Sequence, residues 1–280
     1  MMMRDITRDQ GYDGNAAQFA LAEPDAPNET PETTGANMSL VEHLEELRRR
    51  FLYCLVAVAS GTLVTFLFYE PLLQFLLSPL PSKANALAAR NGKPLLAVTG
   101  IGEGFSVVLK LAIAAGIALA TPVWLYHLWG FLSPALTRRE RRYALPFTFV
   151  GVVLFLAGLA VGFITLRYPL NWLLSFSDQS FVEIITADNY STFVSYFMLA
   201  FGFTFELPLV LTFLAIIGVL SSQTLKKNRA SILVSLWTVS CFITPGMDPY
   251  SPLILGVAFT ILYGISEGLI GIMGQKSGAV

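Results

Sequence analysis

Long apolar runs, separated by short polar stretches, dominate the chain. Six uncharged or nearly uncharged runs follow residue 50, and they cover residues 51–69, 111–136, 143–166, 190–220, 230–244 and 252–273. A helix needs about 20 apolar residues to cross the hydrocarbon core, and no run shows the regular alternation of a membrane barrel strand. We therefore predict an all-α integral membrane protein with six transmembrane helices in one membrane domain, residues 38–275.

The last two runs are short. Run 230–244 has fifteen residues, and the sixth run also has fifteen if Glu267 marks where it leaves the lipid. A helix of that length rises only about 22 Å against a hydrocarbon core of about 30 Å. Either the ends of these helices lie a turn further out, or helices five and six are short and sheltered by neighbours. The link 245–252 is rich in turn residues, which predicts a tight hairpin.

Composition agrees with a lipid environment but sets the N-terminus apart. The chain is 54% hydrophobic and 13% charged, whereas soluble domains are about a quarter charged. In residues 1–37, seven of the nine charges are acidic, and this tail resembles neither a secretory signal nor a transit peptide. We expect it to be disordered. Met38 opens a well-patterned segment, so we also hypothesise that residues 1–37 are a start-site artefact.

Basic residues fall mainly on one side of the predicted spans. Eleven of them precede span one, follow span six, or lie between spans two and three or four and five: Arg48, Arg49, Arg50, Arg138, Arg139, Arg141, Arg142, Lys226, Lys227, Arg229 and Lys276. The other side has four, spread over two longer loops. The positive-inside rule then predicts that both termini are cytoplasmic.

Two carboxylates stand next to arginines on that basic side. Leu40, Leu44 and Leu47 recur at helical spacing before span one, which predicts an amphipathic helix at the interface. Glu46 and Arg50 form an i,i+4 pair on it, and the simplest interpretation is that this pair supports the helix. Glu140 stands among four arginines, either as a solvated loop ion pair or as an anion available to an incoming cation.

A third carboxylate interrupts the fourth span. Glu206 is costly inside an apolar helix, by at least about 2.5 kcal/mol at the bilayer centre, so it should face a polar crevice or stay protonated. Pro208 weakens the same helix locally by freeing a carbonyl one turn back. We interpret Glu206 as functional, and we interpret Lys110, at the outer end of span two, as snorkelling to the interface.

Enzymatic motifs are missing from the sequence. There is no GxSxG, HExxH or GxxxxGK[ST] motif, and two histidines and two cysteines, both cysteines inside apolar runs, provide no metal cluster. We therefore expect no enzyme activity, no cofactor and no metal. No inverted repeat of the kind that builds secondary transporters is visible.

The polar segments taken together resemble the TatC family, the polytopic subunit of the twin-arginine protein translocase. The similar segments follow one another between Met38 and Met273: HLEELRRR at 43–50, SPL at 78–80, TPVWLYHLW at 121–129, Phe131, PAL at 134–136, ERR at 140–142, FGFTFELP at 201–208 and TP at 244–245, followed by Asp248. One such segment would be a weak signal, but the whole ordered set is specific.

The resemblance implies a glove-shaped, concave bundle that recognises signal peptides with two consecutive arginines. It assigns the twin-arginine site to Glu46 and Glu140, with Arg48, Arg50 and Phe131 on the same surface. Glu206 would lie inside the concave face, near the path of the inserted signal peptide. The resemblance implies no cofactor.

The same resemblance places partner contacts at the other end of the chain. The short fifth span and the hairpin around Asp248 would contact the single-span partners TatA and TatB, although Pro252 stands where many relatives have a glutamine. We assign structural roles, in loops and at helix ends, to Pro79, Pro122 and Glu103. Other expected partners are the lipid bilayer and further copies of the chain, with no nucleic acid.

Three functions remain open from the sequence. The leading hypothesis is a translocation receptor powered by the proton gradient and located in a bacterial plasma membrane, since no transit peptide is visible. The alternatives are a small-solute or ion transporter that uses Glu206 for proton coupling, and a purely structural scaffold that tolerates substitution of all three glutamates.

Overall fold

The computed structural model describes residues 40–80, 96–132, 144–176, 185–245 and 248–277. The regular elements in these ranges are helices, apart from one isolated parallel bridge between Ala97 and Thr186. The helices are α1 (Leu40–Leu67), α2 (Tyr69–Leu77), α4 (Glu103–Leu119), α5 (Thr121–Leu132), α6 (Ala144–Thr165), α7 (Arg167–Ser175), α8 (Ala187–Thr204), α9 (Leu207–Ile216), α10 (Ser222–Lys227), α11 (Arg229–Ile243) and α12 (Tyr250–Ser277). The predicted tail of residues 1–37 lies outside the described ranges.

Four prolines divide the longer apolar runs into consecutive helices. A proline has no N–H to donate, and its ring clashes with the carbonyl four residues earlier. Pro71, Pro122, Pro169 and Pro208 each lie in the first turn of a helix. The helices that precede them end three or four residues before each proline, at Leu67, Leu119, Thr165 and Thr204. At Pro122 the resulting bend between α4 and α5 is 54°.

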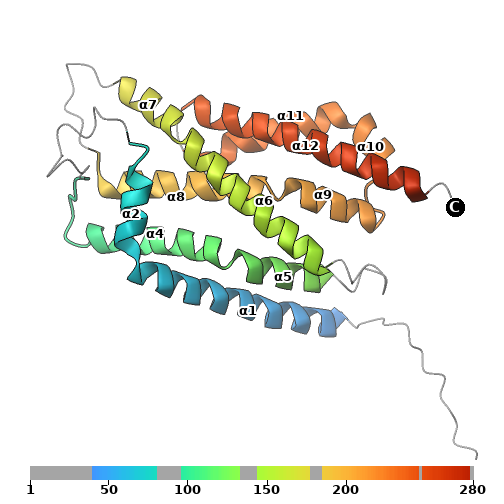
Figure 1. Cartoon of the computed structure of the whole chain (residues 1–280), viewed down its shortest axis with the longest axis horizontal. Coiled ribbons are helices and arrows are strands. Elements are labelled where there is room, and N and C mark those ends of the chain that lie inside the picture. The colour runs from blue at the N-terminus through green and yellow to red at the C-terminus, as the bar shows by residue number, and fades with distance from the viewer. Residues whose placement is uncertain (1–39, 81–95, 133–143, 177–184, 246–247, 278–280) are drawn as a thin grey trace, which may run out of the picture.

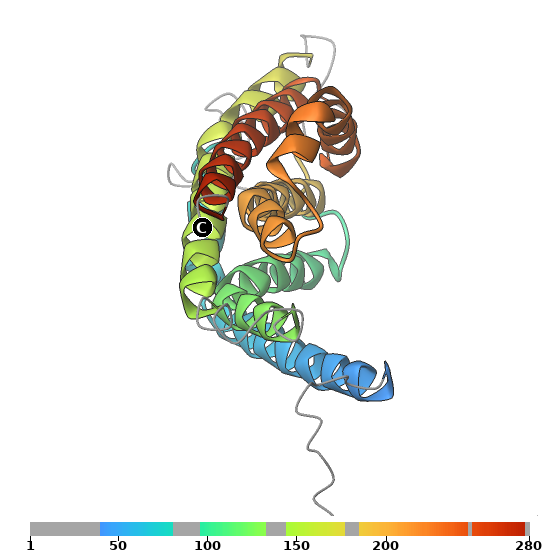
Figure 2. The same ribbon diagram turned by 90° about the vertical axis from the view of Figure 1, so that its right-hand side faces the viewer.

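The long helices run roughly along one common direction, and α6 crosses them obliquely (Figure 1). Helix α1 packs on α4 and α5, α8 packs on α4 and α6, and α12 packs on α11 and α9. Seen from the side, the helices follow a curve from α1 to α11 (Figure 2). The start of α1, the end of α5, α10 and the end of α12 lie at the same end of the bundle, which we call the basic end; α2 and α7 lie at the opposite end, the α2 end (Figure 1).

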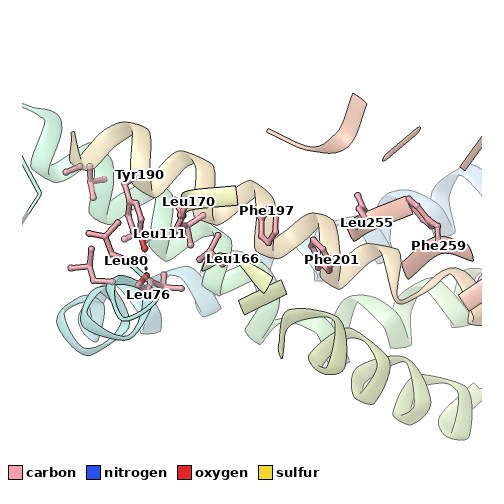
Figure 3. Packing of buried hydrophobic residues seen from close by; sticks show 14 residues of the cluster. Leu76, Leu80, Leu111, Leu166, Leu170, Tyr190, Phe197, Phe201, Leu255 and Phe259 are labelled. Atoms are coloured by element: carbon pink, nitrogen blue, oxygen red, sulfur yellow. Dashed lines mark hydrogen bonds between the residues drawn. The ribbon is translucent and has the colours of Figure 1, made fainter. Parts of the chain in front are cut away.

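The main apolar core lies towards the α2 end and joins α2, α4, α7, α8 and α12. Figure 3 shows its side chains, among which Leu166, Phe201 and Leu255 are fully buried. The Tyr190 hydroxyl donates a 2.5 Å hydrogen bond to the carbonyl of Leu76 and so fixes α2 across the end of α8. Many large apolar side chains are exposed on the outside of the bundle, as expected where lipid is the solvent.

Glycines allow two helix pairs to approach to backbone contact. A Cβ atom on Gly116 of α4 would lie 2.6 Å from the backbone nitrogen of Thr62, and one on Gly61 would lie 2.8 Å from the Gly116 carbonyl. Between α6 and α8, a Cβ on Gly158 would lie 2.6 Å from the Phe201 carbonyl. Membrane helices associate largely by such close packing of small residues, because lipid removes the hydrophobic driving force between them.

The helices are long and apolar enough for several membrane crossings. Among the described residues, four helical stretches can span a membrane, and the bent α4–α5 pair makes a fifth if it is counted as one span. Helix α11 has fifteen residues, the length predicted for the fifth span. The helices of the first two spans begin earlier than predicted. The amphipathic segment and the first span form one continuous helix, α1, and the helix of the second span, α4, begins at Glu103.

The prediction of a short sixth helix is wrong. Helix α12 has 28 residues and continues for ten residues beyond Glu267. The Glu267 side chain is only 15% exposed, and its carboxylate lies 3.8 Å from the guanidinium of Arg229 at the start of α11. A neighbouring cation therefore compensates this charge, so Glu267 does not end the helix.

Candidate functional site

The first candidate site is formed at the basic end by α1 and α5. Arg50 donates from Nε and Nη2 to Oε1 of Glu46, at 2.9 and 2.5 Å, and both side chains are largely buried, at 21% and 14% exposed. The second carboxylate oxygen of Glu46 is buried and has no hydrogen-bond partner among the described residues. One oxygen is thus held by an arginine on the same helix, while the other remains able to accept a hydrogen bond.

Helix α5 packs against the guanidinium of Arg50. A Cβ atom on Gly130 would lie 2.0 Å from Nη1 of Arg50, so the guanidinium occupies the space that a side chain at position 130 would need. Phe131 follows and is half-buried, and Arg48 is exposed on α1. Glu46, Arg48, Arg50 and Phe131 therefore share the basic end. Glu140 lies in 133–143, outside the described residues.

Glu206 forms a second candidate site in the interior of the bundle. It lies in the break between α8 and α9 and is 7% exposed, and neither carboxylate oxygen has a hydrogen-bond partner among the described residues. A Cβ on Gly151 of α6 would lie 3.3 Å from Oε2 and 2.8 Å from Leu125 of α5. From the sequence we expected either a polar crevice or a protonated carboxyl. No described residue forms a hydrogen bond with the carboxylate, and Gly151 of α6 and Leu125 of α5 lie on the neighbouring helices.

Asp248 is occupied within the chain. It is 4% exposed, and its two oxygens accept hydrogen bonds from the backbone N–H and the hydroxyl of Ser251, at 2.6 and 2.7 Å. This is the geometry of a helix N-cap at the start of α12. The carboxylate expected to contact partners therefore fixes the first turn of α12.

A polar network that sequence reasoning missed connects α4 and α8 at the α2 end. Lys110 donates to Asp188 at 2.6 Å and to Thr192 at 3.2 Å, so its ammonium group has partners on α8 that the snorkelling interpretation did not include. Glu103 accepts from the backbone N–H groups of Thr99 and Asp188, at 2.5 and 3.2 Å. Lys110 and Asp188 are 78 positions apart in the chain. Helical periodicity relates only residues within one helix, so it could not predict this pair.

The remaining structural assignments fall at turns and helix ends. Pro79 is half-buried in the turn after α2, and Pro122 is exposed at the second position of α5. Glu103 is the first residue of α4 and closes the turn that begins at Thr99.

The fold and these sites together define a helical integral membrane protein with a charged site at one end and a buried carboxylate inside. The family model described as "Sec-independent protein translocase protein (TatC)" matches residues 42–257. The TatC of Desulforapulum autotrophicum is 37% identical over 84% of this chain and 85% of the relative, and that of Koribacter versatilis is 36% identical over 86% and 88%.

The solved structures agree with the sequence relatives. A crystal structure described as "Twin Arginine Translocase Receptor- TatC in DDM" matches with a TM-score of 0.70 and 28% identity, covering 82% of this chain and 99% of the other. The chain therefore belongs to the TatC family. This is a family of membrane translocase subunits that act in protein transport and not a family of enzymes.

Proposed function

We propose that the protein is the signal-peptide receptor and core subunit of a twin-arginine translocase. It would export folded proteins with the proton-motive force, together with single-span partners of the TatA and TatB type and further copies of itself. The observation that carries the proposal is the half-satisfied carboxylate of Glu46, held by Arg50 at the basic end, with one buried oxygen that receives no hydrogen bond from any described residue. The name of the crystallised relative, a twin-arginine translocase receptor, supports the same role.

The chemistry of this carboxylate suits an arginine ligand. Arginine has a rigid fork of donors that matches a carboxylate, and lysine has none. A hydrogen bond to a charged group contributes about 1.5–3 kcal/mol. Two carboxylates, Glu46 and Glu140, would therefore contribute about 3–6 kcal/mol before desolvation and screening are subtracted. In this proposal Arg50 orients Glu46, while Arg48 and Phe131 complete the surface that meets the signal peptide.

The proposal requires the basic end to face the cytoplasm. We infer six crossings, made by α1, α4–α5, α6, α8–α9, α11 and α12, within a membrane domain of residues 38–275. The basic residues at the start of α1 and on α10 favour this orientation in a bacterial inner membrane. The start of α1 and the end of α12 lie at the same end of the bundle (Figure 1), which supports an even number of crossings.

Glu206 would act further along the path of the signal peptide. A buried carboxylate without a partner is costly unless it is protonated or receives a polar group. We propose that the inserted signal peptide passes the helix break that carries Glu206, inside the concave face. Asp248 would support the TatA- and TatB-type partners indirectly, by fixing the first turn of α12.

Substitution of each glutamate by glutamine tests the receptor role. Glu46→Gln and Glu140→Gln keep the shape of the side chain but remove the charge, so export of a twin-arginine reporter should fall at least about tenfold. Glu45→Gln is the matched control, because Glu45 is exposed on the same turn of α1. Photocrosslinking from position 46 should capture a peptide with Arg-Arg more strongly than one with Lys-Lys. Normal export by both variants at normal protein levels would refute the proposal.

The buried carboxylate of Glu206 also favours a second candidate function, proton-coupled transport of a solute, which can be tested. No described residue donates a hydrogen bond to its two oxygens, and such a buried carboxylate is what a proton-coupled solute transporter would use. The purified protein alone in liposomes would then move a solute under a pH gradient. The receptor proposal expects no flux under those conditions, and flux that Glu206→Gln abolishes would favour the transporter.

A further inference from the structure

A polar pocket lies at the basic end, away from Glu46 and Glu206. It is an open pocket with a volume of about 740 Å³, and it is bordered by α10, the start of α11 and the C-terminal part of α12. Figure 1 shows α10 beside the C-terminal part of α12. Binding pockets for small ligands usually measure about 300–1,000 Å³. The pocket is therefore large enough to hold a molecule and not only a few waters.

The floor of the pocket consists of glycines on α12. Gly264, Gly268 and Gly271 follow one another at helical spacing and all line the pocket. A Cβ atom on Gly264 or Gly268 would meet no heavy atom within 4 Å, and one on Gly271 would meet only the Ser222 hydroxyl, at 3.8 Å. No neighbouring helix in the described structure uses the space that these glycines leave, in contrast to the tightly packed Gly116 and Gly158.

The wall of the pocket carries more positive than negative charge. Lys226 and Arg229 line it together with one carboxylate, Glu267. Arg229 is 59% exposed, and its only ion pair in the described part of the chain is the loose 3.8 Å contact with Glu267. Lys226 has no ion pair with any described residue. The hydroxyls of Ser221 and Ser222 add hydrogen-bonding groups beside these cations.

The position of the pocket along α12 points to the membrane surface. The apolar stretch of α12 that can span a membrane ends at Ile272, and the pocket lies along its last three turns, from Gly264 to Ile272. On the same stretch Ile265 and Leu269 are exposed, at 50% and 45%. Cations and hydroxyls thus lie beside apolar side chains at the boundary between hydrocarbon and water.

We propose that this pocket binds the headgroup of an anionic phospholipid from the adjacent leaflet. Its phosphate would lie between Lys226 and Arg229, and the glycine floor would let the glycerol backbone approach α12 closely. The acyl chains would lie along Ile265 and Leu269. Basic pockets between membrane helices on the cytoplasmic side bind anionic headgroups for the same electrostatic reason. This binding is independent of the recognition of signal peptides.

Retention of lipid by the purified full-length protein tests the proposal. Native mass spectrometry would follow binding of phosphatidylglycerol, and phosphatidylethanolamine at equal concentration would measure the preference for an anionic headgroup. Lys226→Gln should weaken retention of phosphatidylglycerol about fivefold, the typical effect of one interfacial cation. Lys227→Gln is the matched control, because Lys227 carries the same charge on α10 but does not line the pocket.

A steric variant provides a second, charge-independent test. A Cβ atom on Gly268 would meet no heavy atom within 4 Å, so Gly268→Leu should keep the fold while its side chain takes up space in the pocket and displaces the phosphatidylglycerol. Gly104→Leu is its control, because Gly104 on α4 is equally open but lies far from the pocket. Equal retention by Lys226→Gln and Lys227→Gln, or by the two leucine variants, would overturn the proposal. Displacement of the lipid by inorganic phosphate at equal concentration would also overturn it, in favour of a phosphate site.

Discussion

The cap on α12 provides the sharpest test of how this structure supports partner binding. Replacing Asp248 with alanine removes both acceptors of Ser251, whose side chain is fully buried. Loss of an N-cap costs about 0.5–2 kcal/mol, and a buried hydroxyl without a partner costs about 1–3 kcal/mol. We therefore expect Asp248→Ala to destabilise the protein by about 2–4 kcal/mol.

Two further variants separate the loss of the cap from the loss caused by the unpaired Ser251 hydroxyl. Asp248→Asn keeps a capping acceptor and should lose less than half as much stability. The double variant Asp248→Ala with Ser251→Ala removes the hydroxyl that was left without a partner, so it should be more stable than Asp248→Ala alone. For a chain of this size, about 2–4 kcal/mol corresponds to a fall of roughly 5–15 °C in the unfolding temperature.

The assay is thermal unfolding of the purified protein in detergent, followed by near-ultraviolet circular dichroism, together with co-purification of a TatB-type partner. If Asp248 acts as a cap, Asp248→Asn keeps most partner association and Asp248→Ala loses association and stability together. An Asp248→Ala protein that unfolds within about 2 °C of the wild type but no longer binds its partner would refute this reasoning. Asp248 would then contact the partner directly.

Three other substitutions have distinct expected outcomes. Lys110→Met breaks the half-exposed pair with Asp188 and should lower stability by no more than about 1 kcal/mol, measured as a small fall in the unfolding temperature. Gly116→Leu drives a side chain into the backbone of α1 near Gly61 and should cost at least about 1–3 kcal/mol, with loss of folded protein after detergent extraction. Glu206→Leu removes a buried carboxylate that has no hydrogen-bond partner in the described structure, so we expect a higher unfolding temperature but loss of twin-arginine export. A stable Gly116→Leu protein, or full export by Glu206→Leu, would contradict these assignments.

The sequence predicted the helices well where a single rule governs them. Long uncharged runs identify apolar helices, and prolines mark where the helices end, as Pro71 and Pro208 show. The predicted helix length is wrong where a charged residue was taken as the end of a span. Glu267 was expected to end the sixth span, but the nearby Arg229 allows α12 to continue past it. The tight hairpin predicted at 245–252 already places the fifth helix beside the sixth, so this error came from judging Glu267 by itself, without a possible partner on the neighbouring helix.

The candidate site was predictable to a different extent at each residue. The pairing of Glu46 with Arg50 follows from their spacing on one helix. The space for the Arg50 guanidinium, in contrast, depends on Gly130 of a different helix. The occupied carboxylate of Asp248 was not foreseen, although Ser251 stands three residues later, at capping distance in the sequence. Lys110 and Asp188 come together only through the packing of α4 on α8.

The helix break at Glu206 links the shape of the bundle to its chemistry. Pro208 ends α8 at Thr204 and leaves two residues, Phe205 and Glu206, between the helices. Irregular backbone at membrane depth is tolerated only where protein covers it or where it lines a cavity, and here α5 and α6 cover it through Leu125 and Gly151. The proline that breaks the helix thus also places a carboxylate where lipid does not reach it. A polar group that enters the bundle at this level would find an acceptor already in position.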